Sequence, residues 1–261
     1  MYLTLNAELK KYFFQDEDLF TQIMTIRGEI FREVQGRCTQ RIVLGDHTYF
    51  LKQHYGVGWK EIFKNFFQLN WPVLGAKNEW LAIKRLQELG IPTMDVVGYG
   101  CRGINPARLE SFILTRELTD TISLEDYCRD WHITLPPVQM KRKLIRSVAD
   151  IARKLHENGV NHRDFYLCHF LLKKESLPQL ELFLIDLHRA QVRQHVPERW
   201  VIKDVAGLYF SSKDIGLTTR DLLRFVREYR QQPLRTILLN EKIFWQKVKQ
   251  RGDKLYQRHS T

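Results

Sequence analysis

Three side chains of types that serve phosphoryl transfer lie close together in this chain. Asp164 follows Asn161-His-Arg, His169 comes five residues later, and Asp186 follows Asp164 by 22 residues in Leu184-Ile-Asp-Leu-His. Transfer of a phosphoryl group needs one carboxylate to orient the attacking hydroxyl group and accept its proton, and a second acidic group to hold Mg²⁺ against the phosphates. A lone His-Arg-Asp often arises by chance as a surface ion pair, so its surroundings decide its meaning.

A lysine and a glutamate upstream of this region belong to the same chemistry. Lys52 ends the apolar run Tyr49-Phe-Leu, and Glu79 follows it by 27 residues at the start of a predicted helix. A strand lysine held by a helix glutamate and directed at the α- and β-phosphates of ATP completes the set of groups that kinases use. Either residue alone is more often a solvated charge. Their order together with Asp164, His169 and Asp186 is a specific signal.

The chain departs from the usual kinase pattern at several points. It contains no G-x-G-x-x-G sequence, and Gly36 alone marks the first predicted hairpin turn. His169 stands where kinases carry a metal-binding asparagine, and it serves either as a metal ligand or as a structural histidine bonded to the backbone. Asp186-Leu-His replaces Asp-Phe-Gly, and no Ala-Pro-Glu follows. These differences indicate a kinase fold outside the protein-kinase group.

The elements that position these residues change character along the chain. Alternating apolar and polar residues with turn signals predict strands at 29–34, 41–44 and 48–52, and further strands at 96–100 and 111–115. Helical spacing of apolar residues predicts helices at 61–69 and 78–89. A phenylalanine stripe in the first of these helices, at Phe63, Phe66 and Phe67, is expected to pack in the core rather than to contact lipid.

The second half of the chain is mostly helical. Ser123 is expected to start a short helix, and a long helix runs from Pro137 to Asn158-Gly159. Two strands, 170–172 and 182–185, bracket a polar turn just before Asp186 and bring it near Asp164. We therefore predict an α+β, two-lobed, protein-kinase-like fold. The β-rich N-lobe spans 1–117 and the helical C-lobe 118–261, with ATP and Mg²⁺ between them.

The charge and composition restrict the class of protein. The 261 residues carry 41 Lys+Arg against 30 Asp+Glu, a net charge of +11, which favours an anionic partner. The four cysteines form no C-x-x-C pair, which argues against a zinc site and fits a reducing compartment. The first residues lack the pattern of a signal peptide, and no stretch is long enough to span a membrane. We expect a soluble protein that is at most peripheral to a membrane.

At the level of motifs, the chain resembles the lipopolysaccharide core heptose(I) kinase family of Gram-negative bacteria. The resemblance rests on three segments above all: Asn161-His-Arg-Asp-Phe-Tyr-Leu-Cys-His-Phe-Leu-Leu, Leu184-Ile-Asp-Leu-His-Arg-Ala-Gln and Lys203-Asp-Val-Ala-Gly-Leu-Tyr-Phe-Ser-Ser. It extends from about residue 28 to residue 256. The resemblance implies ATP-dependent phosphorylation of the 4-hydroxyl of the first inner-core heptose, at the cytoplasmic face of the inner membrane.

The resemblance also implies roles for individual residues. Asp164 matches the catalytic aspartate, and Asp186, with His169 beside it, matches the metal-binding aspartate. Lys52 and Glu79 match the ATP phosphate lysine and its partner. In addition, Asp204 resembles a buried aspartate that braces the catalytic loop. The implied cofactors are ATP and Mg²⁺.

The acceptor side is less specific. Four arginines beside the site residues are candidates for binding carboxylates or phosphates of the acceptor through forked hydrogen bonds, although each is equally compatible with a solvated basic loop; they are Arg163, Arg189, Arg193 and Arg199. The expected partners are the lipopolysaccharide core glycolipid, the membrane surface and, less securely, an acidic protein.

The residues alone leave two other functions open. One is a kinase of the same fold that acts on Kdo or on protein tyrosine, and the other is a basic pseudokinase or binding module. The chain shows no RNP, zinc-finger or helix-turn-helix pattern, so nucleic acid is not expected as a partner.

Overall fold

A computed structural model describes residues 1–34, 36–56, 58, 75–177 and 179–259. The contacts divide the chain into two compact units. The N-terminal unit comprises Met1–Lys84 and Met94–Leu118, and the C-terminal unit comprises Arg85–Thr93 and Thr119–Thr261. The domain limits drawn from the sequence, 1–117 and 118–261, stay a prediction. The predicted helix at 61–69, with its phenylalanine stripe, lies outside the described residues.

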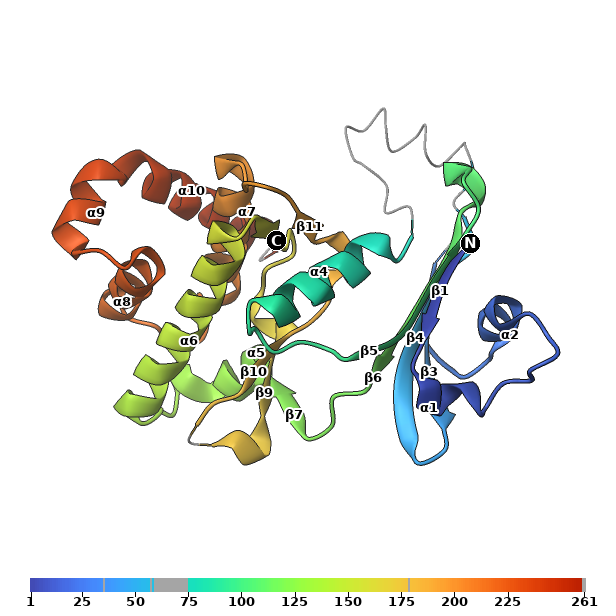
Figure 1. Ribbon diagram of the computed structural model, residues 1–261. Coiled ribbons are helices and arrows are strands. Elements are labelled where there is room, and N and C mark those ends of the chain that lie inside the picture. Colours follow the sequence, from blue (N-terminus) through green and yellow to red (C-terminus); the bar gives the residue numbers. More distant parts are fainter. Residues whose placement is uncertain (35, 57, 59–74, 178, 260–261) are drawn as a thin grey trace. The chain divides into compact units, whose positions relative to one another are not determined.

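The N-terminal unit contains a six-stranded antiparallel sheet of order β1-β5-β6-β4-β3-β2. Figure 1 shows most of these strands. Its strands are β1 (Tyr2–Leu5), β2 (Glu29–Val34), β3 (Arg37–Leu44), β4 (His47–His54), β5 (Val96–Arg102) and β6 (Glu110–Arg116). The five strands predicted from alternation are confirmed, and β3 starts four residues before the expected limit. Gly45 turns β3 into β4 with φ of 61°, a backbone conformation that glycine adopts without steric cost.

Three helices accompany this sheet in the described part of the unit. They are α1 (Ala7–Lys10), α2 (Leu19–Thr25) and the first residues of α4 (Lys77–Glu88). The Asp18 side chain caps α2 by accepting from the Phe20 N–H. Phe20 and Ile23 of this helix are fully buried against Leu51 of β4 and Phe112 of β6. This packing holds β4, and therefore Lys52, at a fixed position within the unit.

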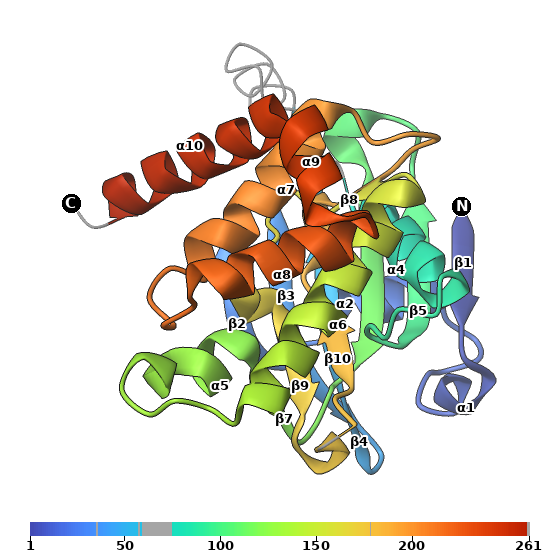
Figure 2. The same ribbon diagram turned by 90° about the vertical axis from the view of Figure 1, so that its left-hand side faces the viewer.

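The C-terminal unit is largely helical (Figure 2). Its helices are α5 (Leu124–Cys128), α6 (Val138–Glu157), α7 (Glu198–Ser211), α8 (Thr219–Arg230), α9 (Leu234–Asn240) and α10 (Lys242–His259). The long helix α6 agrees with the prediction and buries one apolar face, including Leu144, Val148 and Leu155. Helix α6 packs on α8, and α7 packs on α10. These helices form the rigid support for the loops described below.

Short strands and turns connect the helices of this unit. One small sheet has the order β10-β9-β7, and β8 pairs with β11. The strands are β7 (Thr121–Ser123), β8 (Val160–Asn161), β9 (Phe170–Lys173), β10 (Leu182–Leu184) and β11 (Gln191–Val192). The predicted antiparallel pair at 170–172 and 182–185 is confirmed as β9 and β10. No helix in the described part of the chain is long and apolar enough to cross a membrane.

Candidate active site

The loop after β8 is held in shape by a carboxylate from α7. One oxygen of Asp204 accepts from the His162 N–H at 2.6 Å, and the other accepts from the Arg163 N–H at 2.8 Å. Asp204 is fully buried. Arg163 has a φ of 75°, which costs a non-glycine residue free energy. The two hydrogen bonds stabilise this unfavourable backbone and direct the following residue, Asp164.

His162 links the same loop to the strand end that carries Asp186. Its Nε2–H donates to the carbonyl oxygen of Ile185 at 2.9 Å, and its side chain is fully buried. Burial lowers the pKa of His162, against the smaller opposite effect of Asp204. The imidazole is therefore neutral, and its buried hydrogen bond joins the two loops of the site.

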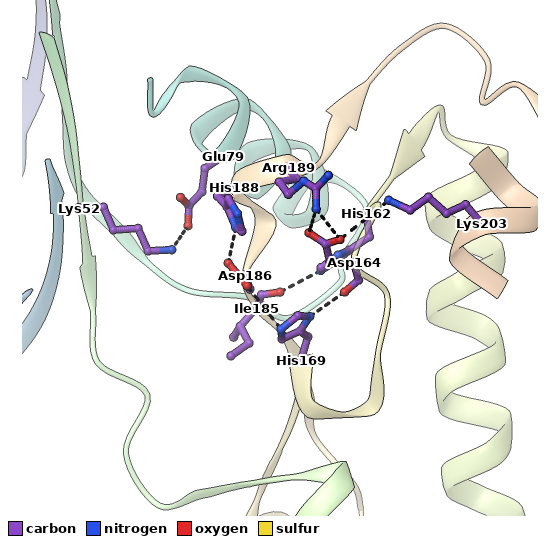
Figure 3. A network of polar contacts seen from close by, with 10 residues as sticks. All are labelled: Lys52, Glu79, His162, Asp164, His169, Ile185, Asp186, His188, Arg189 and Lys203. Carbon is purple, nitrogen blue, oxygen red and sulfur yellow. Dashed lines mark hydrogen bonds and ion pairs between the residues drawn. The ribbon is translucent and has the colours of Figure 1, made fainter. Parts of the chain in front are cut away.

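Asp164 lies between two cations from different elements (Figure 3). Nη1 of Arg189 lies 3.0 and 3.1 Å from the two carboxylate oxygens, and Nζ of Lys203 on α7 lies 3.9 Å from one of them. The Asp164 side chain is 16% exposed, and these two contacts hold its carboxylate in a fixed orientation in a partly desolvated place. An ionised, oriented carboxylate is the form that a general base requires.

His169 and Asp186 converge on one point. His169 Nδ1 donates to the backbone carbonyl of Asp164 at 2.7 Å, and its Nε2 lies 3.4 Å from Oδ2 of Asp186. Because Nδ1 donates to this carbonyl oxygen, Nε2 is the ring atom that faces the carboxylate. His188 Nδ1 donates to the other Asp186 oxygen at 2.5 Å.

The donor set suits a metal that is shared with a substrate. Among the described residues, no group of three or more His, Cys, Asp and Glu side chains is arranged to hold a metal ion by itself. Mg²⁺ in nucleotide sites is bound by one or two carboxylates together with phosphates and water. Asp186 fits that requirement. His169 is a softer nitrogen donor, held by a carbonyl as metal-binding histidines are.

Lys52 and Glu79 form an ion pair within the N-terminal unit. Nζ of Lys52 lies 2.5 Å from Oε1 of Glu79, and the side chains are 13% and 1% exposed. The other oxygen, Oε2, is buried and accepts no hydrogen bond from the described residues. A buried pair of this kind fixes the ammonium group at the end of β4. The structure thus brings together these two predicted residues.

Three of the four predicted acceptor arginines lie around a tryptophan on α7. Cζ of Arg163, Arg193 and Arg199 lies 4.9, 5.9 and 5.5 Å from the ring centre of Trp200. Arg189 instead contacts Asp164 directly. Arg199 is exposed, and the others are partly buried.

The sequence argument assigned no role to Lys203, Trp200 or His188. The sequence of α7 already indicated where Lys203 and Trp200 lie. Trp200, Lys203 and Asp204 follow the i, i+3, i+4 spacing that places side chains on one helix face. Asp204 was expected to brace the catalytic loop. That spacing then predicts that Trp200 and Lys203 face the loop as well.

The helices of the C-terminal unit surround an apolar cavity of about 460 Å³ that is partly open to solvent. Helices α5 to α8 and α10 contribute most of its lining, which includes Leu144, Val148, Leu208, Leu222, Phe225 and Trp245. Lys249 also lines it. An interior of this size without filling side chains is unusual in a packed unit, and its apolar walls suit an apolar group.

Comparison with known proteins identifies the group of enzymes to which this arrangement belongs. The model of the lipopolysaccharide kinase (Kdo/WaaP) family matches residues 21–229, most of the chain. The chain belongs to this family. The matched range includes Lys52, Glu79, Asp164, His169 and Asp186. The family predicted from the motifs is therefore confirmed.

Relatives match over most of their length. Lipopolysaccharide core heptose(I) kinase WaaP of Escherichia coli (strain K12) is 51% identical over 228 residues, which cover 85% of each chain. The protein of the same name from Pseudomonas aeruginosa (strain PAO1) is 46% identical over 261 residues, covering 99% of this chain and 97% of the relative.

A solved structure shows the same fold. WaaP in complex with acyl carrier protein superposes with a TM-score of 0.85 and 43% identity, covering 98% of this chain and 100% of that one. The predicted α+β, protein-kinase-like fold class is confirmed. The prediction of a kinase that uses ATP is confirmed by the family. The roles assigned to individual residues stay predictions.

Proposed function

We propose that this chain transfers the γ-phosphate of ATP to the 4-hydroxyl of the first heptose of the lipopolysaccharide inner core. The observation that carries the proposal is the similarity to curated heptose(I) kinases over 85–99% of the chain, at 46–51% identity. The arrangement around Asp164 supports it, because an oriented carboxylate beside a possible metal position is what transfer to a hydroxyl group requires.

In this proposal each side chain has a defined task. Asp164 accepts the proton of the attacking hydroxyl group, while Arg189 and Lys203 keep its carboxylate oriented. The ammonium group of Lys52, held by Glu79, binds the α- and β-phosphates of ATP. The proposed acceptor-binding residues are Arg163, Arg189, Arg193 and Arg199. Asp186 and His169 would hold Mg²⁺, which neutralises phosphate charge when bound.

The test is phosphate transfer from labelled ATP to dephosphorylated core lipopolysaccharide, followed by mass and linkage analysis of the released oligosaccharide. Wild-type protein should label the 4-hydroxyl of the first heptose. Asp164→Asn, which cannot accept the proton, should turn over about 10²–10⁴-fold more slowly and still bind ATP. Label on Kdo or on protein tyrosine would assign a different acceptor. ATP binding without transfer to any acceptor would instead indicate a pseudokinase.

The proposal includes a protein partner. WaaP has been solved with acyl carrier protein, and this chain combines a net charge of +11 with an apolar cavity of about 460 Å³. We infer that it binds an acyl carrier protein and that the cavity receives the acyl chain. Calorimetric titration with carrier protein with and without an acyl chain tests this. The acylated form should bind more tightly, and Val226→Trp, which fills the cavity, should abolish the difference.

The proposed place of action is the cytoplasmic face of the inner membrane, where the protein acts as a peripheral protein. The anionic glycolipid acceptor and the positive charge of the chain support this, since basic surfaces are attracted to anionic lipid. Sedimentation with vesicles of phosphatidylglycerol should be lost at high salt. Vesicles of phosphatidylcholine alone serve as the control, and equal binding to both would contradict an electrostatic attachment.

A further inference from the structure

The surroundings of Trp200 hold more positive charge than the protein itself neutralises. Five cationic side chains gather there: Arg163, Arg189, Arg193, Arg199 and Lys203. The carboxylates that act on Arg163 and Lys203 are Asp164 and Asp204. Asp204 is already occupied by two backbone N–H groups. The cluster is therefore strongly cationic beside the proposed catalytic base.

Like charges at this density repel each other, and this repulsion helps to lower the pKa values of Arg163 and Lys203. Burial and the neighbouring Arg189 lower the pKa of Arg163. Burial also lowers the pKa of Lys203, with Arg189 and Arg163 adding to it and Asp164 opposing it. A bound anion would remove this cost, because it would compensate the charges and replace the lost water.

Trp200 explains how the cations stay together without an anion. The Nζ of Lys203 lies 5.7 Å from the ring centre, at a distance similar to those of the three arginines. A cation over an indole face is attracted by the negative potential of the ring. Trp200 stands one helical turn before Lys203 on α7, so the ring brings the helix and the loop residues Arg163 and Arg193 to one place.

Two donors in this cluster also lack acceptors. Nε1 of Trp200 and Nε of Arg163 are buried, and no group of the described residues accepts a hydrogen bond from either. Buried donors are normally satisfied, and those that are not call for an explanation. The oxygen atoms of a bound anionic group would accept hydrogen bonds from both donors and would compensate the positive charges.

We propose that Trp200 assembles these cations into a subsite for an acidic group of the acceptor glycan, a sugar carboxylate or a phosphate that lies near the hydroxyl group to be phosphorylated. The proposal rests on the proposed function and deepens it. Arg189 belongs to the cluster and also contacts both oxygens of Asp164. Binding of the acidic group therefore orients the acceptor and the base together. Trp200 itself is a positioning residue.

The first test is steady-state kinetics of Trp200→Leu and Trp200→Phe. The leucine variant loses the π face, so KM for core lipopolysaccharide should rise about tenfold or more, the loss that follows from one weakened charged hydrogen bond. KM for ATP should stay unchanged. The phenylalanine variant keeps an aromatic face and should recover part of the loss. Arg199→Gln should resemble the leucine variant, and Arg235→Gln, an exposed arginine on α9, is the matched control.

The source of the acidic group is resolved by changing the acceptor. One acceptor has its sugar carboxylates reduced to alcohols, and another has its phosphates removed. The modification that raises the wild-type KM without affecting Trp200→Leu further identifies the bound group. If neither modification changes the wild-type KM, the subsite does not exist.

Calorimetric titration with the acceptor glycan in the absence of ATP separates this proposal from the proposed function. Tight binding by wild type and weak binding by Trp200→Leu would support the subsite even if the phosphorylated hydroxyl proves to be another one. Equal glycan binding by wild type, Trp200→Leu and Arg199→Gln, all with the same melting temperature, would overturn it.

Discussion

At the scale of single residues, His169 is the clearest difference from an ordinary kinase site. Its Nδ1–H is used by the Asp164 carbonyl, which leaves Nε2 directed at Asp186 at 3.4 Å. A structural histidine would be explained by the first contact alone. The second contact favours the proposed metal position, because it places a ring nitrogen beside a carboxylate oxygen, two donor types that bind metals.

Two substitutions of His169 separate these roles. If Nε2 binds the metal, His169→Ala should lower kcat strongly, and His169→Asn, which offers an oxygen ligand, should retain part of the activity. The measurements are kcat and melting temperature at one fixed Mg²⁺ concentration. A purely structural histidine gives another pattern: both variants melt earlier and share nearly the wild-type kcat per folded molecule.

His162 predicts a pH dependence of stability. Burial lowers its pKa in the folded state below the value of about 6.5 in the unfolded chain. As the pH falls below that value, His162 binds a proton in the unfolded state but not in the folded state. The free energy of unfolding therefore decreases. The limit is about 1.4 kcal/mol per pH unit for one group.

The check is urea unfolding between pH 5 and 7 of wild type and His162→Gln. The glutamine amide can still donate to the Ile185 carbonyl but does not titrate. The variant should be less stable at pH 7 and should show a shallower decrease toward pH 5, since the chain's other eight histidines are common to both proteins. Parallel curves would mean that His162 is protonated in the folded state as well.

At the scale of elements, α7 organises the site. It carries Asp204, which holds the loop backbone, and Lys203, which approaches the Asp164 carboxylate. Helix α7 is in turn packed against α10. A change in the position of α7 therefore moves the loop, the base and the cation cluster together.

Asp204→Asn should show how much this brace contributes. An amide offers one acceptor oxygen, so one of the two backbone N–H groups loses its partner inside the protein, which costs about 1.5–3 kcal/mol of unfolding free energy. We expect kcat to fall as well, because Arg163 and Asp164 lose their fixed position. Urea unfolding and kcat are the measurements.

Asp253→Asn is the matched control for this brace. Asp253 on α10 pairs with Lys213 and Lys249, and its side chain is 28% exposed. Its loss should cost less than about 1 kcal/mol, as is usual for surface pairs, and leave kcat unchanged. If the two variants were equally stable, the hydrogen bonds of Asp204 would not hold the loop.

At the scale of the whole molecule, the charge is unevenly distributed. Residues 220–261 carry 11 Lys and Arg residues against 4 Asp and Glu residues. Exposed charges act over about 10 Å at 0.1 M salt and are screened further at higher salt. This surface therefore attracts an anionic glycolipid most strongly at low ionic strength.

The dependence of the two KM values on salt tests this attraction. The KM for lipopolysaccharide should rise steeply with NaCl, and the KM for ATP should rise less, because Lys52 and its partner Glu79 are largely buried. Potassium glutamate at the same ionic strength controls for specific effects of chloride. An equal rise for both substrates would argue against a dedicated surface for the anionic acceptor.

Local pattern was enough to predict most of the elements. Alternation in 48–52 and helical periodicity in 137–158 reflect burial of one face, which depends on residue type and spacing alone. Alternation also predicted the strand at 29–34, although all six residues of β2 are exposed. The order of Lys52, Glu79, Asp164, His169 and Asp186 was sufficient to predict a kinase, and the family confirms that activity. The roles of the individual residues stay predictions. Strand β1 was not predicted, because its four residues pair with β5 more than 90 positions away.

Contacts between distant residues were decided only by the tertiary structure. Lys203 forms an ion pair with Asp164, which lies 39 positions earlier in the sequence, and Trp200 contacts Arg163, which lies 37 positions earlier. No local period encodes these distances, because they depend on how α7 packs against the loop after β8. The same holds for the apolar cavity, since the residues that line it read as ordinary core positions in each helix. The sequence therefore determined the reaction class, and the packing decided which charges surround the base.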